Sequence, residues 1–532
     1  MHNRRRPILR LASAGGVVLL AAGAAVRGSP SDTVPVHLDP LALSRTIDAE
    51  IAKAWKAAKI PEPKTADDSE FLRRITLDLN GTIPTLAETA AFFQNRDRDK
   101  RRKKIDELLE RPAYAEHMAR TWVTLLAGRT YRDQAFHRNV FQAWFEKAFA
   151  ANLPYDEMVR ELLAGVGNPE EAGAVNLMTR YSRNGGPAEI AGAVSRTLLG
   201  VQIQCAQCHN HPSEAWTQED FWGFAAFFAR VKPRPIRVEG AMADAPPKFE
   251  LVEARTGEVY LPDSEPRRPV YPKFLSTAGP EPKPFLKRRD TLAGWMTSAE
   301  NPTFAKALVN RVWATLIGRG IVDPVDDLSA KHPPSHPELL DAAASAFAKS
   351  GFDLRYLFRA IGNSRVYQLA SGPQPKDEEQ EKLFRVARLR PMSPEQLFYS
   401  LARLGDAARD AKALRQLERQ REQYLRMFVF LFGNDEMQES DEFRGTLQQV
   451  LFLMNDPNAD RGIRAAGRAI AARKTTDEER IDTIFLTLLS RPAEAAEKRS
   501  FAAYLAGAAN REEAYEDLFW AVINTTEFIY NH

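Results

Sequence analysis

Helical periodicity runs through most of this sequence and is interrupted in one place. The first pattern has its apolar residues four positions apart, at Leu43, Ile47, Ile51 and Trp55. Such spacing places the apolar side chains on one face of a helix. Similar patterns continue to residue 230, stop in a Pro-rich stretch over residues 233–284, and resume from residue 287. We therefore expect a mainly α protein with two helical domains.

The Pro-rich stretch contains segments that resemble strands. Polar and apolar side chains alternate over residues 248–253 and follow a similar pattern over 258–261, with Arg255-Thr256-Gly257 between them. Alternation is typical of half-buried strands, and glycine is typical of turns. We predict that these two segments form a small β hairpin within a connection over residues 233–285. This connection would join a domain over 38–232 to a domain over 286–532, since 532 residues exceed what one core usually serves.

Residues 1–28 have the composition of an export signal. Arginines at positions 4–6 precede an apolar run over residues 11–26, and small residues and another arginine follow. This run is shorter than the roughly 20 residues that a membrane-spanning helix needs. We expect an exported protein of the periplasm or cell envelope, attached to a membrane only if the signal stays uncleaved.

Charge is nearly balanced, with 73 basic and 70 acidic residues and a formal net charge of +3. Nucleic-acid-binding proteins concentrate positive charge on one surface. The densest basic run, residues 96–104, is typical of the solvated first turn of a helix. We therefore predict no nucleic-acid partner.

The two cysteines of the chain stand together in Cys205-x-x-Cys208-His209. This spacing is the attachment signature of c-type haem, in which both thiols bond to the haem and the next histidine ligates the iron. Export would supply the compartment in which such haem is attached, and the aromatic residues of 216–228 could wall a flat macrocycle. We predict covalently bound haem c, His209 as the proximal iron ligand, and electron transfer or another haem redox role. The sequence does not decide whether the protein is an enzyme.

Two other interpretations of this segment stay open. Together with His211, it offers two thiolates and two imidazoles, which suffice in type and number for tetrahedral zinc. The spacing is compressed, because structural zinc sites usually draw their second pair of ligands from a distant segment. Alternatively, Cys205 and Cys208 form a disulfide or a dithiol. In both cases the protein would be an exported binding or scaffold protein without haem.

The haem interpretation also suggests roles for His211 and for five other histidines and methionines. His211 follows the proximal ligand too closely to reach the opposite face of the iron, so we expect it to support the site by a hydrogen bond, with metal ligation as the alternative. A second axial ligand would come from elsewhere, and the candidates are His117, Met118, His137, Met178 and Met242. Such a ligand favours electron transfer, whereas an open position permits small-molecule or peroxidatic chemistry.

A further pair of histidines, His332 and His336, flanks Pro333-Pro334 just after Asp326-Asp327. A metal or catalytic cluster is one interpretation of these residues. A capping or surface position for His336 at a helix start is the other. Sequence signatures of nucleophile-elbow hydrolases, P-loop proteins, dinucleotide-binding folds and zinc proteases are not found.

Several motifs resemble one known pair of domains. The motif Phe71–Gly81 with Pro84-Thr85, and residues 200–228, resemble the planctomycete-type cytochrome-c-like domain of unknown function (PSCyt-two type). Residues 288–371 resemble its usual partner (PSD-one type), and the motifs that carry this resemblance are 301–302, 309–313, 318–322, 333–340, 364–367, 451–457 and 524–528.

This resemblance implies an exported, mainly helical, two-domain protein with a c-type haem motif. It also implies a role near polysaccharide breakdown, with a redox partner or exported sulfatase-like proteins as partners. In one respect the sequence departs from the family pattern. Relatives carry His-Pro before the Arg-Thr-Gly turn, and here Glu253-Ala254 occupy these positions. Any metal that the histidine serves in relatives would lack this ligand here.

Overall fold

The computed structural model describes residues 38–129, 135–182, 185–236, 248–262, 264–275, 287–298, 301–373, 375, 377–406 and 457–532. The predicted export signal and Met242 lie outside these residues, as do the motif residues 451–456.

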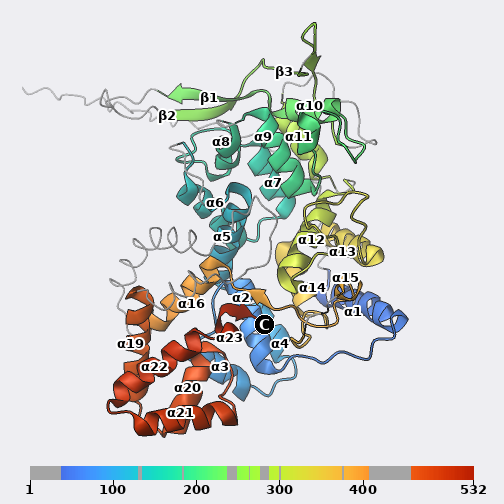
Figure 1. Ribbon diagram of the computed structural model, residues 1–532. Coiled ribbons are helices and arrows are strands. Elements are labelled where there is room, and N and C mark those ends of the chain that lie inside the picture. The colour runs from blue at the N-terminus through green and yellow to red at the C-terminus, as the bar shows by residue number, and fades with distance from the viewer. Residues whose placement is uncertain are drawn as a thin grey trace, which may run out of the picture. The chain divides into compact units, whose positions relative to one another are not determined.

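The first helical region contains ten α-helices (Figure 1), namely α1 (Pro40–Ala57), α2 (Asp68–Asn80), α3 (Leu86–Gln94), α4 (Lys100–Glu110), α5 (Pro112–Ala127), α6 (Arg138–Ala150), α7 (Tyr155–Ala164), α8 (Asn176–Ser182), α9 (Pro187–Val194) and α10 (Gln218–Ala225). The predicted apolar face of α1 is confirmed, because Leu43, Ile47, Ile51 and Trp55 are all buried. The start of α3 was also predictable, since Thr85 and Glu88 form a capping box that satisfies backbone N–H groups of the first turn.

The second region is also helical. Its elements are α11 (Arg288–Met296), α12 (Phe304–Ile317), α13 (Pro337–Lys349), α14 (Leu354–Gly362), α15 (Glu378–Glu381), α16 (Pro394–Asp406), α19 (Pro457–Ala471), α20 (Asp477–Leu488), α21 (Ala495–Gly507), α22 (Arg511–Ile523) and α23 (Thr526–Ile529). The predicted mainly α class is therefore confirmed. A search of the described residues found no helix with the length and apolar character needed to cross a bilayer.

The predicted hairpin is wrong in its pairing. Strand β2 (Lys248–Glu253) pairs with β1 (Val231–Ile236), whereas β3 (Val259–Tyr260) pairs with β4 (Pro269–Val270), so the connection holds two antiparallel ribbons. Two prolines hid β1 in the sequence. Pro233 and Pro235 occupy alternate positions of β1, opposite Leu251 and Phe249. The Ala254 N–H donates to the Arg230 carbonyl, so Arg230 and Ala254 form a hydrogen-bonded pair, and such pairs recur at every second position of the ribbon. Pro233 and Pro235 occupy the positions in between, where a proline removes no hydrogen bond of the ladder.

A third ribbon joins the C-terminus to the body of the protein. Strand β5 (Arg390–Pro391) pairs with β6 (Tyr530–Asn531), and the Met392 N–H donates to the Ile529 carbonyl at 2.9 Å. In addition, the Asn531 side-chain amide donates to Asp78 of α2 at 2.7 Å, and the label of the C-terminus lies near that of α2 in Figure 1. The last residues of the chain are therefore fixed against residues of the first helical region.

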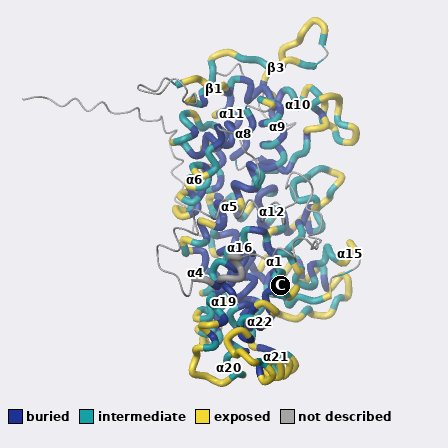
Figure 2. Tube along the Cα trace, turned by 60° about the vertical axis from the view of Figure 1, so that its left-hand side comes forward, coloured by how far each residue is buried: buried dark blue, intermediate teal, exposed yellow. Residues whose placement is uncertain are grey.

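The hydrophobic core extends across the predicted domain limits. Its largest cluster includes Ile47 of α1 and Val123 of α5 together with Trp313 of α12 and Leu357 of α14. A second cluster packs Leu77 of α2 against α16, α19, α20, α21 and α22. Figure 2 shows how thoroughly α5, α8 and α9 are buried. Buried side chains on both sides of the predicted limits at residues 232 and 286 thus belong to the same cluster.

Candidate functional site

The cysteine segment lies between α9 and α10, where the chain changes direction twice. Helix α9 continues into a π-helical turn, Ser195–Leu199, which ends at Gly200 with φ 64°. A side chain at Gly200 would meet the Leu328 side chain at 2.9 Å, and the Leu328 N–H donates to the Gly200 carbonyl at 2.8 Å. Glycine is thus required here for both backbone conformation and space. From this point the chain enters a short 3₁₀ turn, Gln204–Gln207.

The two thiols belong to this 3₁₀ turn. Cys205 lies within it, Cys208 is its C-cap, and both are exposed and free. Because a 3₁₀ helix has three residues per turn, side chains three positions apart lie on the same side. Ile203 and Ala206 are fully buried beneath the turn. Both sulfur atoms therefore face solvent from one side of the turn, as two bonds to one haem edge require.

His209 follows directly and is exposed. Its Nδ1 lies 2.7 Å from the carbonyl oxygen of Asn210. Because a carbonyl oxygen only accepts hydrogen bonds, Nδ1 carries the proton, and in the neutral ring Nε2 keeps a free lone pair. A histidine that ligates a metal usually donates its other ring N–H to such a group. His209 is thus in the tautomer that can bind iron through Nε2.

His211 is in the opposite tautomer. Its Nδ1 faces the backbone N–H groups of Glu214 at 3.0 Å and Ser213 at 3.3 Å, so Nδ1 accepts and the proton of the neutral ring is on Nε2. Its own backbone N–H donates to the Trp216 carbonyl at 2.8 Å. The lone pair of Nδ1 is thus used by backbone N–H groups, and Nε2 carries the proton of the neutral ring. Through its ring and its backbone N–H, His211 closes the turn over residues 211–216. In this tautomer the neutral ring of His211 has no unoccupied lone pair that could bind zinc.

The aromatic residues after the turn are divided between core and surface. Four are fully buried in the core, namely Phe221, Phe224, Phe227 and Phe228. Trp216 and Trp222 are half-buried and pack against the edge of the main cluster. Only these two tryptophans of the predicted haem walls therefore keep part of their surface accessible beside the thiols.

Of the candidates for a second axial ligand, four lie in the described residues. Met118 and Met178 are buried in the main cluster, and His137 is half-buried at the N-cap of α6. His117 is buried beside Arg120 and donates to the Asp78 carbonyl, and burial with this neighbouring charge lowers the pKa of His117 to about 3. The structure thus gives His117 a hydrogen-bond partner within α2.

Within the described residues, no three His, Cys, Asp or Glu side chains are grouped as a metal ion would need. This finding applies equally to Cys205, Cys208, His209 and His211, and His211 faces backbone N–H groups through Nδ1. The donors that a c-type haem uses are two thiols and one imidazole nitrogen, and these are accessible on Cys205, Cys208 and His209.

Comparison with protein families agrees with the motifs. Residues 46–233 match the model of PSCyt2, described as a protein of unknown function (DUF1549), and residues 288–412 match that of PSD1, described as a protein of unknown function (DUF1553). The chain thus contains a PSCyt2 domain followed by a PSD1 domain. This confirms the resemblance expected from the sequence. No curated protein and no solved structure matches the chain.

The PSCyt2 region contains the cysteine turn, and the adjoining connection contains Glu253. Glu253, the residue at which the resemblance led us to expect histidine, accepts the backbone N–H of Arg288 at 2.8 Å and pairs with Arg289 at 3.6 Å. A carboxylate at a helix N-terminus is favourable because the first N–H groups lack partners. Glu253 therefore caps α11, and no metal is needed to explain the residue.

The PSD1 region contains the second histidine pair, and the structure separates the roles of its members. His332 Nε2 lies 3.3 Å from Asp327 Oδ2. The expectation that His336 caps a helix or lies at the surface is wrong for its side chain, which is 8% exposed and makes no cap bond, although the residue occupies the N-cap position of α13. Its ring packs 5.4 Å from that of Phe384, and burial lowers the pKa of His336. His336 is thus a neutral core residue.

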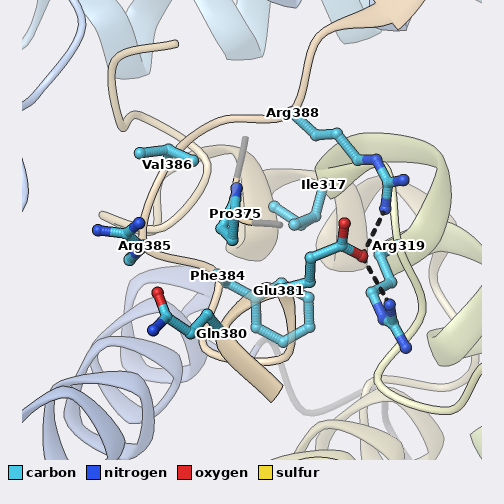
Figure 3. A pocket seen from close by; sticks show the side chains of 9 residues that line it. All are labelled: Ile317, Arg319, Pro375, Gln380, Glu381, Phe384, Arg385, Val386 and Arg388. Atoms are coloured by element: carbon cyan, nitrogen blue, oxygen red, sulfur yellow. Dashed lines mark hydrogen bonds and ion pairs between the residues drawn. The ribbon is translucent and has the colours of Figure 1, made fainter. Parts of the chain in front are cut away.

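A shallow cleft in the PSD1 region is lined by Ile317, Arg319, Pro375, Gln380, Glu381, Phe384, Arg385, Val386 and Arg388. In Figure 3, Glu381 reaches between Arg319 and Arg388 and pairs with both. Arg319 also pairs with Glu378 and Asp323. Because these charges neutralise one another, the cysteine turn is the stronger candidate for a functional site.

Proposed function

We propose that the turn Cys205–His209 is the covalent attachment site of a c-type haem, and that the protein is an exported haem protein with a redox role. The observation that carries this proposal is that two exposed cysteines, three positions apart on one 3₁₀ turn, precede a histidine whose Nδ1 faces a carbonyl and whose Nε2 is therefore available. When bound, the group would supply one-electron chemistry at its iron.

The attachment chemistry needs only the residues of the turn. Each thiol adds across one vinyl group, so that the sulfur bonds to one carbon and the thiol hydrogen goes to the other. Nothing is released, and no oxidant is required. Cys205 and Cys208 would each form one thioether, and His209 would hold the iron through Nε2. The mass of the chain would rise by that of one whole haem.

The test is to express the full chain in an exporting host that has the haem c maturation machinery. We expect a visible spectrum with a Soret band that persists after denaturation and extraction with acidified organic solvent. Replacing both cysteines, Cys205→Ser with Cys208→Ser, should abolish this retained band. A wild-type chain without retained haem would refute the proposal.

The second candidate is an exported binding or scaffold protein in which the same two thiols form a disulfide. The exposure of both cysteines on one side of the turn favours it equally. Thiol counting and intact mass on haem-free protein show whether this disulfide is present, since a disulfide removes both thiols and lowers the mass by two hydrogens. Elemental analysis tests the zinc version, for which the tautomer of His211 is unfavourable.

The type of redox chemistry depends on the other face of the iron. A methionine or histidine ligand there would favour transfer of electrons to a redox partner, whereas an open position would admit small molecules. Binding of carbon monoxide to the reduced protein distinguishes the two. A place beside polysaccharide breakdown in the periplasm or cell envelope, with exported sulfatase-like proteins as partners, rests on the family resemblance alone.

A further inference from the structure

The two halves of the cysteine turn are held in different ways. The first half is anchored by burial, because Ile203 and Ala206 are fully buried and the Ala206 N–H donates to the Ile203 carbonyl at 2.9 Å. In the second half Cys208, His209 and Asn210 are all exposed. Packing therefore fixes the backbone around Cys205 and contributes little around Cys208.

Hydrogen bonds from α10 hold this second half. The side-chain amide of Gln218 donates to the Cys208 carbonyl at 2.9 Å and to the Gln207 carbonyl at 3.4 Å. The indole N–H of Trp222 donates to the same Gln207 carbonyl at 3.0 Å. In addition, the backbone N–H of Gln218 donates to Asn210 Oδ1 at 3.0 Å. Two side chains of α10 thus bind consecutive carbonyls of the turn.

Helix α10 is well placed to give these bonds. Gln218 and Trp222 are four positions apart and therefore lie on one face of the helix. Its N-terminus is fixed by a capping box of Thr217 and Asp220, and Asp220 also pairs with Lys273 at 2.5 Å. Phe221 is fully buried. The side chains that meet the turn therefore project from a rigid support.

We propose that Gln218 and Trp222 are positioning residues, which orient Cys208 and His209 for attachment and ligation of the haem. This inference rests on the proposed function and deepens it. It predicts an asymmetry between the two cysteines. When the bonds from α10 are removed, Cys205 keeps its buried anchor, whereas Cys208 loses its orientation.

The test uses the full chain with Gln218→Met and Trp222→Phe, alone and combined. Each change introduces an apolar side chain without a hydrogen-bond donor: methionine has about the length of glutamine, and phenylalanine keeps an aromatic ring in place of the indole. The matched controls are on α6, where the Gln142 amide donates to Glu146 at 2.7 Å and the Trp144 indole N–H donates to Glu161 at 2.9 Å. Gln142→Met and Trp144→Phe remove the same chemical groups away from the turn.

The first readout is the number of thioether bonds. In alkaline pyridine, haem with one unreacted vinyl group absorbs at longer wavelength than haem with two thioethers, and peptide mapping shows which cysteine reacted. We expect the share of chains attached only through Cys205 to rise by roughly fivefold for each hydrogen bond lost. Equal shares in the variants and the α6 controls would overturn the inference while the proposed function stands.

The second readout needs no haem. In chains produced without the maturation machinery, the alkylation rates of Cys208 and Cys205 are compared by mass spectrometry. We expect their ratio to change by a similar factor in Gln218→Met and to stay constant in Gln142→Met. A constant ratio in both would overturn the inference. If wild-type protein holds no haem, the proposed function fails, and this ratio still decides whether α10 orients Cys208.

Discussion

The Tyr367 hydroxyl donates a hydrogen bond of 2.8 Å to Asp78 Oδ2, across 289 positions of the sequence. The same carboxylate pairs with Arg390 at 2.8 Å and accepts the Asn531 amide at 2.7 Å. Asp78 is only 2% exposed. One carboxylate of α2 therefore connects the PSCyt2 region, the PSD1 region and the C-terminal ribbon of β5 and β6.

We expect Asp78→Asn to lower the free energy of unfolding by about 3–5 kcal/mol. The substitution leaves the Arg390 guanidinium, whose side chain is 18% exposed, without its counter-charge, and breaking a largely buried pair in this way is strongly destabilising. Urea unfolding followed by circular dichroism measures the loss. Tyr367→Phe serves as the control and should cost about 1–2 kcal/mol, since it removes one neutral donor. Losses of equal size would contradict this account of Asp78.

Gly81→Ala should destabilise the protein more than Gly351→Ala. Both glycines have positive φ, 68° and 74°, so both changes incur the left-handed penalty of about 1–2 kcal/mol. At Gly81 a β-carbon would also collide with the His117 ring, whereas nothing lies within 4 Å of one at Gly351. Thermal unfolding of the two variants compares them. Equal melting temperatures would show that the His117 ring moves without cost.

His117 should make stability depend on pH between about 6.5 and 3. Its pKa falls from the ordinary 6.5 to about 3 on folding, so in this interval the unfolded chain binds a proton that the folded chain excludes. Stability is therefore complete above pH 6.5 and decreases as the pH falls, by about 1.4 kcal/mol per pH unit for one proton. Urea unfolding from pH 7 to pH 4 measures the slope.

The control for this prediction is His117→Gln, which removes the titrating group. Between pH 6 and 4, the free energy of unfolding of this variant should change less steeply with pH than that of the wild type, and the difference in slope should correspond to about one bound proton. His532, whose pKa burial and the Arg73 charge lower to about 4, contributes in the same direction and is retained in both proteins. Parallel slopes would mean that His117 does not remain neutral in the folded protein.

Within the haem proposal, His209→Ala and His211→Ala should differ. Only His209 has a free Nε2, so its replacement should keep the thioethers but change the axial ligation of the iron, which the visible and electron paramagnetic resonance spectra report. His211→Ala should leave these spectra unchanged, because its ring bonds to the backbone of Ser213 and Glu214. Identical changes in both variants would contradict the assignment of the two tautomers.

The sequence by itself determined those features that depend on neighbouring residues. The helical face of Leu43, Ile47, Ile51 and Trp55, and the capping box of Thr85 with Glu88, involve residues within a few turns of each other, so the pattern is visible along the chain. The spacing of Cys205, Cys208 and His209 is likewise visible along the chain, and the haem attachment that it predicts stays a prediction. The family also followed from local motifs.

The tertiary structure decided how distant segments meet. It paired β2 with β1, although the two prolines of β1 argue against a strand there. The pairing is possible because both prolines occupy positions that make no hydrogen bond to β2. It buried His336, and it gathered Asp78, Tyr367, Arg390 and Asn531 from four parts of the chain. It also separated His209 from His211. The type of residue is the same, but the proton on each ring follows the backbone group that the fold brings to Nδ1.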